Sequence, residues 1–358
     1  MSYWLIFSIS VALSAGLTGV VRLIALHFSI VDDPNRSPGR KYQRQAIPLL
    51  GGLALYSSFV AMMVWLLPDL TQGYLLNKHV FGMIAAGGVI VLGGIWDDVA
   101  NLSAKRQVIF PLIAAGIIVA VGIGISYISN PFGGVINLAQ WQWTVFWYND
   151  LPYQITLWAD LFVVVWLLGT TYTTKLLDGL DGLVAGVLAI GALIIFFLSI
   201  SPTVAQPETG VVALVVAGVG LGFLFWNFAP AKIYLGESGA LLCGFWLGVL
   251  AIISGGKIAT ALLILGLPII DVIWVIVRRS LIEKRSPFSG DTSHLHFQLL
   301  EMGLSNRTIA ILYYLITLVF GVITLLASGL LKIIALVLLT IIAIGLIGAA
   351  YRHSRRHV

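Results

Sequence analysis

The sequence predicts an all-α, polytopic membrane protein, and three observations carry that prediction. Hydrophobic residues make up 59% of the 358 residues, whereas only 10% are charged, against about 25% in soluble domains. A single soluble domain cannot bury that much apolar surface, so lipid must form part of the solvent. The third observation is a series of about eleven apolar runs, each near the roughly 20 residues that a spanning helix needs.

The apolar runs follow one another along the chain. Ten spans remain if the weakest run, 157–174, does not cross. The longest interruption, 129–156, is polar and aromatic, which is typical of an interfacial hairpin or helix with tryptophans at headgroup depth. No repeat or linker divides the sequence, so we expect one integral-membrane domain over residues 1–358. The runs are 3–29, 47–67, 79–98, 108–128, 157–174, 182–200, 210–228, 238–255, 258–278, 308–328 and 331–351.

Basic residues set the expected orientation. Sixteen of the 20 lysines and arginines fall in alternate gaps or at the C-terminus, on one side of the predicted bundle. Because cytoplasmic loops carry the excess of Lys and Arg, this side is predicted to be cytoplasmic, with the N-terminus outside and the C-terminus inside. The net charge of +5 follows from this bias and predicts no nucleic-acid partner. We therefore expect a multi-pass protein of the cell (inner or plasma) membrane.

Carboxylates gather on the same predicted side of the membrane. Six of them come from four different gaps between the spans. Carboxylates close to a membrane are costly, and they usually mark a functional cavity. We therefore expect a polar site at the cytoplasmic ends of the spans. The six are Asp97, Asp98, Asp178, Asp181, Glu237 and Asp291.

Three short motifs hold five of these acids. In "WDDVANLSAKRQ" the adjacent Asp97 and Asp98 can hold Mg²⁺ or activate a nucleophile, although solvated acids in a helix-end turn give the same pattern. In "KLLDGLDGL" two acids three residues apart share one face, and the glycines allow a ligand close approach; a glycine-rich capping turn is the simpler alternative. In "YLGESGA", Glu237 can bind a metal, and the amides of Ser238 and Gly239 can face an anion, unless this is an ordinary re-entry loop.

Two further segments carry histidines and basic residues. In "SPFSGDTSHLHF", His294 and His296 share a face of an extended segment. No cysteine or third histidine stands nearby, so a phosphate contact is favoured over a transition-metal site, with a merely exposed loop as the alternative. The loop 31–52 contains Arg40 and Lys41, which can attract anionic lipid or a nucleotide, although the positive-inside bias explains most of its charge.

These five segments, in this order, resemble the polyprenyl-phosphate N-acetylhexosamine-1-phosphate transferases. The resemblance covers residues 31 to about 303 and is closer to the N-acetylglucosamine branch than to the muramoyl-pentapeptide branch. It implies a reaction in which sugar-1-phosphate passes from a UDP-sugar to polyprenyl phosphate, releasing UMP, as the first membrane step of cell-envelope glycan synthesis. It also implies a Mg²⁺ ion, with Mn²⁺ as an alternative, and cytoplasmic catalytic loops. A homodimer is left open.

The resemblance also implies roles for individual residues. Asp97, Asp98 and Asp178 form the expected catalytic set, in which Asp97 orients or deprotonates the lipid phosphate, or attacks covalently itself. Glu237 and Asp98 are the expected metal ligands. Tyr234 is expected to stack on uracil, and the histidines are expected to contact phosphate. The full expected substrate-binding set is Lys175, Asp181, Tyr234, Lys232, His294, His296, Arg40, Lys41 and Lys105.

Several positions depart from the family pattern. Gln43 and Phe297 stand where the family has histidines, and Glu237 stands where it has aspartate. Tyr172 and Lys175 replace two asparagines. A protonated lysine offers donors and no acceptor, so Lys175 cannot ligate Mg²⁺. We expect it to neutralise diphosphate or to pair with a neighbouring aspartate of its own motif, unless it points to the headgroups and only marks the membrane edge.

Two other classes of protein compete with this interpretation. A secondary transporter also places carboxylates in its spans, but at the midplane and usually with matching halves. Here the acids lie at one edge, and the two halves do not match. A catalytically degenerate protein that only binds polyprenyl phosphate stays open, because the departures fall on the site itself.

Overall fold

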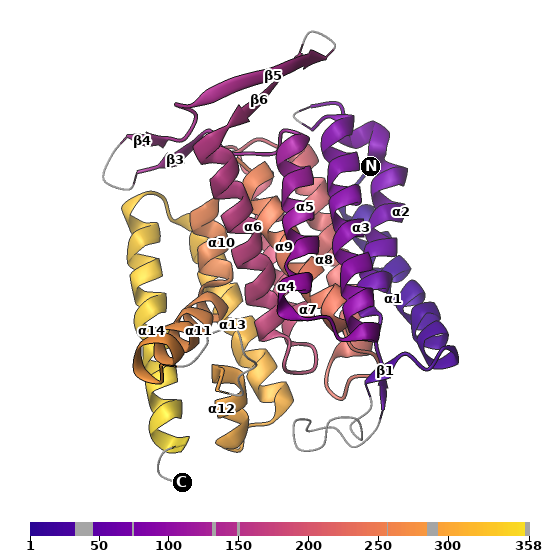
Figure 1. Ribbon diagram of the computed structural model, residues 1–358, viewed down its shortest axis with the longest axis vertical. Coiled ribbons are helices and arrows are strands. Elements are labelled where there is room, and N and C mark those ends of the chain that lie inside the picture. The colour runs from indigo at the N-terminus through magenta and orange to yellow at the C-terminus, as the bar shows by residue number, and fades with distance from the viewer. Residues whose placement is uncertain are drawn as a thin grey trace.

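A computed structural model of the protein describes residues 1–32, 46–73, 75–130, 134–148, 151–255, 257–284 and 293–354. Long helices run side by side, with two β-hairpins across one end of the bundle and β1 and α12 at the other (Figure 1). The helices are α1 (Tyr3–His27), α2 (Gly51–Leu70), α3 (Asn77–Ala100), α4 (Ala104–Gln107), α5 (Ile109–Ala120), α6 (Leu157–Leu177), α7 (Leu183–Ser199), α8 (Pro207–Asn227), α9 (Gly236–Ile253), α10 (Ile258–Ile264), α11 (Gly266–Val277), the π-helical η2 (Arg278–Ile282), α12 (Leu295–Glu301), α13 (Asn306–Leu326) and α14 (Leu330–Ser354).

The helical, polytopic fold class is confirmed. The structure also has a small β component, of which the sequence analysis expected only a possible hairpin at 129–156. The interruption at 129–156 forms hairpins rather than a helix. The strands pair antiparallel as β1–β2, β3–β4 and β5–β6. Their bounds are β1 (Val31–Asp32), β2 (Ile47–Pro48), β3 (Tyr127–Ser129), β4 (Val135–Asn137), β5 (Gln142–Tyr148) and β6 (Leu151–Thr156).

The number of spans differs from a simple count of apolar runs. Within the described residues, eight helices are long and apolar enough to cross a membrane, and α10 with α11, which meet at a bend of 78°, make a ninth if they form one broken span. Helix α7 has 17 residues and α5 has 12. The expected run 108–128 is helical only from Ile109 to Ala120, because Gly122 takes a left-handed φ of +83° and the chain turns towards β3. The total of eleven therefore stays a prediction.

The start of α1 and the end of α14 lie at opposite ends of the bundle, as an odd number of crossings requires (Figure 1). This agrees with the expected placement of one terminus on each side of the membrane. Which end faces the cytoplasm stays a prediction from the basic residues.

Helix α9 is the centre of the bundle, with 89% of its apolar window buried. It contacts α2, α3, α6, α7 and α8. Two glycines permit close approaches: a Cβ on Gly94 of α3 would lie 2.2 Å from Ser238 Cα, and one on Gly244 of α9 would lie 2.3 Å from the carbonyl oxygen of Thr170 in α6. Hence the end of α3 and the helix α6 are held tightly against the beginning of α9.

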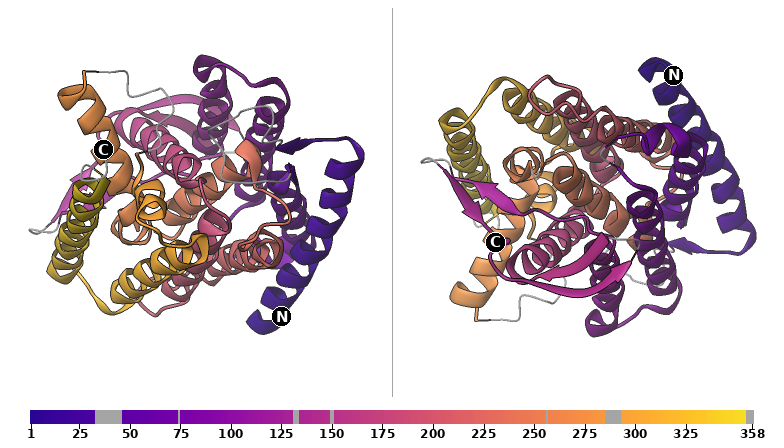
Figure 2. Two further views of the ribbon diagram at one scale, coloured as in Figure 1. Left: turned by 90° about the horizontal axis from the view of Figure 1, so that it is seen from below. Right: turned by 90° about the horizontal axis from the view of Figure 1, so that it is seen from above.

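Helix α11 leaves this bundle at the bend after α10. Both views in Figure 2 show the η2 end of α11 standing apart from the other helices. Its apolar side chains are exposed there, with Ile273 at 54% and Leu281 at 73%. Exposure of such an apolar surface to water is unfavourable, whereas its exposure to lipid is not, which agrees with a membrane protein.

Candidate active site

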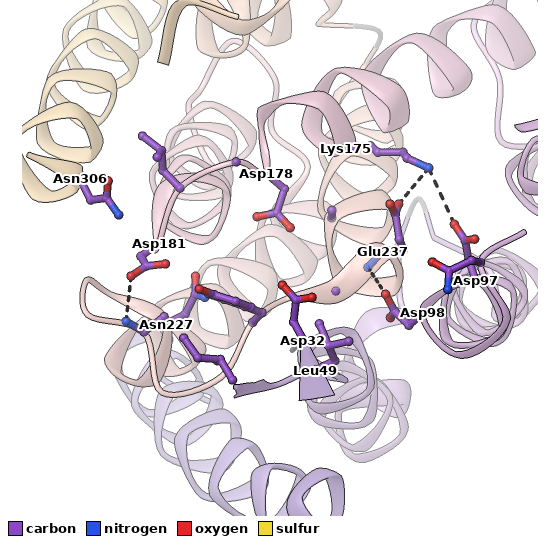
Figure 3. A pocket seen from close by; sticks show the side chains of 18 of the residues that line it. Asp32, Leu49, Asp97, Asp98, Lys175, Asp178, Asp181, Asn227, Glu237 and Asn306 are labelled. Atoms are coloured by element: carbon purple, nitrogen blue, oxygen red, sulfur yellow. Dashed lines mark hydrogen bonds and ion pairs between the residues drawn. The ribbon is translucent and has the colours of Figure 1, made fainter. Parts of the chain in front are cut away.

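A cavity of about 790 Å³ opens at the end of the bundle opposite the two hairpins. It is lined by the ends of α3 and α6, the beginning of α9, and the turns that follow α6 and α8 (Figure 3). Its described lining holds six carboxylates and a single ammonium group, so it is strongly acidic. The carboxylates are Asp32, Asp97, Asp98, Asp178, Asp181 and Glu237, and the ammonium belongs to Lys175.

Asp97 and Asp98 stand at the end of α3 and face different partners. Asn101 ends the helix in a left-handed conformation (φ +49°), so the chain folds back and Asp97 Oδ1 accepts the amide of Leu102 at 2.7 Å. Asp98 Oδ1 accepts the amide of Glu237 at 2.9 Å. A carboxylate is stabilised at the N-terminus of α9 by the helix dipole. The sequence analysis expected an anion at the start of this helix. At the amide of Glu237, that anion is the carboxylate of Asp98.

The approach of Asp98 depends on the glycine before Glu237. Gly236 has φ +68°, and a Cβ there would lie 2.6 Å from Asp98 Oδ2. That second oxygen of Asp98 is buried and has no hydrogen-bond partner among the described residues. An unpaired buried carboxylate oxygen is costly unless a cation or a ligand completes it.

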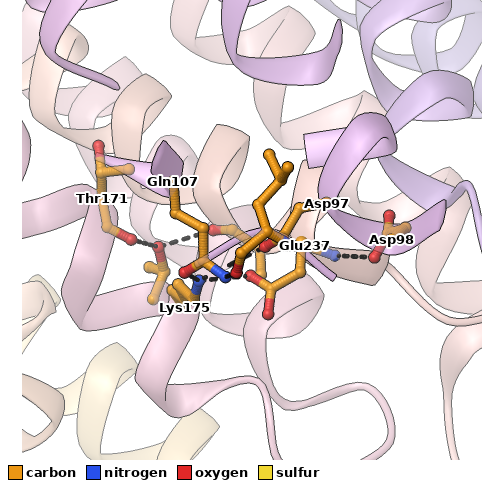
Figure 4. Close-up of polar contacts among 9 residues, drawn as sticks. Asp97, Asp98, Gln107, Thr171, Lys175 and Glu237 are labelled. Atoms are coloured by element: carbon orange, nitrogen blue, oxygen red, sulfur yellow. Dashed lines mark hydrogen bonds and ion pairs between the residues drawn. The ribbon is translucent and has the colours of Figure 1, made fainter. Parts of the chain in front are cut away.

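Lys175 turns into the cavity from the last turn of α6. Its Nζ lies 2.8 Å from Gln107 Oε1, 2.9 Å from Glu237 Oε2 and 4.0 Å from Asp97 Oδ2 (Figure 4). Its side chain is 16% exposed. The alternative in which Lys175 points to the headgroups is therefore wrong. The expected pairing within its own motif is also wrong, because its described ion-pair partners come from α3 and α9.

The turn after α6 places Asp178 and Asp181 in the cavity wall. Burial raises the pKa of Asp178 well above its ordinary value, and the charges of Glu237, Asp98 and Asp181 add to this. Asp181 Oδ2 accepts the amide of Ala231 at 3.0 Å, which ties its turn to the loop after α8. Burial also raises the pKa of Asp181, against that hydrogen bond. Both pKa shifts favour the neutral form of these two carboxyl groups.

Tyr234 lines the cavity from the loop between α8 and α9. Its amide donates to the carbonyl of Pro48 at 2.8 Å, which joins this loop to β2. Burial, followed by the nearby charges of Asp181 and Asp32, raises the pKa of its hydroxyl. The phenol therefore stays neutral at physiological pH. The stacking on uracil stays a prediction.

Neither predicted histidine lines the described cavity. His294 Nδ1 lies 2.9 Å from Asp271 Oδ2, and both side chains are buried. His296 packs behind the turn after α6, where a Cβ on Gly179 would lie 2.4 Å from its Nε2. Burial, followed by the neighbouring His294, lowers the pKa of His296 to about 3, so this ring is neutral. The phosphate contact predicted for the histidines is untested. Among the described residues of this segment, Phe297 reaches the cavity.

Lys232 and Lys105, two further predicted substrate residues, are not part of the described cavity lining. Lys232 is exposed, and its Nζ lies over the ring of Trp226 at 5.7 Å from the centroid. Lys105 is exposed on α4 and is not part of the lining. Arg40, Lys41 and Asp291 lie outside the described residues.

Three residues of the cavity lining, and one partner of a predicted histidine, escaped the sequence analysis. Asp32 is brought to the cavity by the pairing of β1 with β2. Gln107 meets Lys175 across 68 residues of sequence. Asn227 joins two turns, because its Oδ1 accepts the amide of Gly182 and its Nδ2 donates to Ile233. Asp271 gave a usable signal, since a carboxylate within an apolar run is itself a functional hint.

The donor chemistry of the cavity fits a hard divalent cation. Asp98 Oδ2 lacks a partner, and carboxylate and amide oxygens are the ligands that Mg²⁺ accepts. However, the described residues contain no group of three or more His, Cys, Asp or Glu side chains placed to bind a metal ion together. One carboxylate oxygen of Glu237 is already paired with Lys175. The oxygen donors of the cavity are thus of the type that Mg²⁺ accepts, and the ammonium of Lys175 lies beside one of them.

The fold and the site together define a multi-pass membrane protein with an acidic cavity at the ends of its helices. Residues 80–255, which run from α3 through α9, match the glycosyl transferase family 4 model. A probable undecaprenyl-phosphate N-acetylglucosaminyl 1-phosphate transferase of Bacillus subtilis (strain 168) is 32% identical, over 86% of this chain and 79% of its own. The chain belongs to glycosyl transferase family 4, and the family resemblance drawn from its motifs is confirmed.

Two further relatives show the breadth of the family. A decaprenyl-phosphate N-acetylglucosaminephosphotransferase of Mycolicibacterium smegmatis is 34% identical, over 83% of this chain and 75% of its own. A phospho-N-acetylmuramoyl-pentapeptide-transferase of Desulforapulum autotrophicum is 26% identical, over 81% and 82%. The order of identities agrees with the branch that the motifs favoured.

Proposed function

We propose that the chain transfers a sugar-1-phosphate, N-acetylhexosamine-1-phosphate, from a UDP-sugar to polyprenyl phosphate. The products are polyprenyl-diphospho-sugar and UMP, and the reaction is the first membrane step of a cell-envelope glycan. An oxygen of the lipid phosphate forms a bond to the β-phosphorus of the nucleotide. The bond from that phosphorus to the oxygen bridging the two phosphates breaks, and UMP leaves with that oxygen.

The observation that carries this proposal is an acidic cavity at the membrane edge in a chain of this family. The described lining holds six carboxylates and one ammonium, so a diphosphate is repelled unless cations accompany it. Bound Mg²⁺ would supply positive charge to the diphosphate, as phosphoryl transfer requires. Glu237 and Asp98 are the residues proposed to hold it, because they are neighbours across the α3–α9 contact and Asp98 keeps an unpaired oxygen.

The chain's own residues supply positioning and proton handling. Asp97 is fixed by the amide of Leu102 through one oxygen, and its other oxygen is directed towards the ammonium of Lys175. It is proposed to orient the incoming lipid phosphate or to accept its proton. Asp178 and Tyr234 shape the wall on which the nucleotide rests. The prenyl chain stays among the spans while its phosphate reaches the cavity at their ends, on the proposed cytoplasmic face.

The position of the acids weighs against a transporter, because they come from the ends of α3 and α6 and the beginning of α9 rather than from midplane breaks. The decisive experiment uses the full chain in lipid nanodiscs with polyprenyl phosphate, Mg²⁺ and a panel of UDP-sugars, and follows UMP release. We expect release with a UDP-N-acetylhexosamine that needs both the lipid and the metal. Lipid binding without UMP release from any UDP-sugar would instead identify a degenerate binding protein.

A further inference from the structure

Three oxygen atoms surround the ammonium of Lys175, and we call them the cation cradle. They are Asp97 Oδ2, Gln107 Oε1 and Glu237 Oε2, from α3, α4 and α9. An ammonium has three donors and needs such acceptors. The same atoms, two carboxylate oxygens and one amide oxygen, are also the kind of ligand that a hard divalent cation takes.

The cradle is held in place by contacts that do not involve Lys175. Gln107 Nε2 donates to the carbonyl of Leu102 at 2.9 Å, which turns its Oε1 towards the cavity. The amide of Leu102 holds Asp97, and Asp98 holds the amide of Glu237. These contacts orient the side-chain oxygens of Asp97 and Gln107 and the backbone of Glu237, so most of the cradle keeps its shape when its cation changes.

We infer that the cradle holds one cation at a time: the ammonium of Lys175 in the free protein and, once Lys175 has moved out, the divalent cation that Glu237 and Asp98 are proposed to bind. The reason is electrostatic, since two positive charges sharing Glu237 within about 4 Å repel each other strongly in a partly buried site. Lys175 thus weakens the binding of free metal. The displaced ammonium remains in the cavity, where a diphosphate offers it a new partner; that last step rests on the proposed function.

The test measures metal binding directly, with Mn²⁺ as the probe and its electron paramagnetic resonance signal as the readout, on purified full-length protein without nucleotide. We expect Lys175→Met and Lys175→Gln to bind Mn²⁺ at least about tenfold more tightly than the wild type, because a unit charge is removed at contact distance. Lys175→Arg keeps the charge and should bind as weakly as the wild type. Lys257→Met removes a lysine outside the cavity and is the matched control.

Two outcomes overturn the inference. One is a Mn²⁺ affinity of both neutral variants within twofold of the wild type, and the other is an equal gain in Lys257→Met. Two neutral variants are used so that poor folding of one leaves a measurement. UDP should strengthen Mn²⁺ binding more in the wild type than in Lys175→Met, and equal strengthening refutes the diphosphate step. None of these titrations needs turnover. The inference about the cation cradle can therefore hold even if no sugar is transferred, and sugar transfer can occur even if the inference is refuted.

Discussion

The close contact between α3 and α9 makes Gly94→Ala a sharp test of how the site is built. The new Cβ would lie 2.2 Å from Ser238 Cα, whereas ordinary contact begins at 3.4 Å, so the helices must separate by about 1.2 Å. That shift would break the 2.9 Å hydrogen bond from the Glu237 amide to Asp98. Misplacement of a reacting group by about 1 Å can cost about 10²-fold in rate. Overpacking of this kind typically costs about 1–3 kcal/mol in stability.

The assay for this prediction is UMP release in nanodiscs, together with the melting temperature of each protein. Gly169→Ala in α6 is the matched control, because no atom lies within 4 Å of its added Cβ. It should keep its activity, with at most a small gain in stability from helix propensity. If Gly94→Ala retains half of the wild-type rate with an unchanged melting temperature, the α3–α9 contact does not position the site as argued.

Three further predictions address the charges, the buried histidine and the orientation. Asp97→Asn and Glu237→Gln should each lower transfer by about 10²-fold or more while the proteins remain folded, and near-normal turnover in either places the chemistry elsewhere. His296 has a pKa of about 3 in the folded protein, so from about pH 6.5 downwards only the unfolded state gains its proton, and stability falls by up to about 1.4 kcal/mol per pH unit. His296→Gln should therefore flatten the loss of melting temperature between pH 6.5 and 5, and an unchanged slope contradicts this. Thr203 lies in a loop on the predicted outer side and Ser103 in one on the predicted cytoplasmic side. A cysteine at Thr203 should therefore react with an impermeant thiol reagent in intact cells and one at Ser103 should not, and the reverse pattern inverts the orientation. The single native cysteine is buried and should not interfere with the labelling.

The class of fold was accessible from the sequence because lipid imposes a strong constraint: an apolar run long enough to span must be helical. Helix lengths were less accessible. The run after Lys105 is apolar to residue 128, yet Gly122 ends its helix early, and the bend between α10 and α11 falls within one continuous apolar run. Hydropathy reports where lipid is tolerated, whereas these breaks depend on backbone conformation and on the neighbouring helices.

For the site, the motifs identified residues but not their partners. Asp97, Asp98, Asp178 and Glu237 do share one cavity, as their common side of the membrane predicted. The direction of Lys175 could not be predicted, because its partners come from α3, α4 and α9, which only tertiary packing brings together. Which acceptors a long side chain such as Lys175 contacts depends on the residues that the fold brings near it. The spacing of residues in the sequence says little about those neighbours.

The central position of α9 separates the chemistry of the site from the mechanics of the bilayer. Helices α1 and α14 have only 28% and 22% of their windows buried, so they meet the lipid and can tilt when its thickness changes. Helix α9 has almost no surface on which such a change can act. The carboxylate of Glu237 at its N-terminus is therefore carried by a helix whose surroundings are protein on nearly every side. A change of lipid composition can then reach the substrate's prenyl chain while leaving the geometry around Glu237 nearly constant.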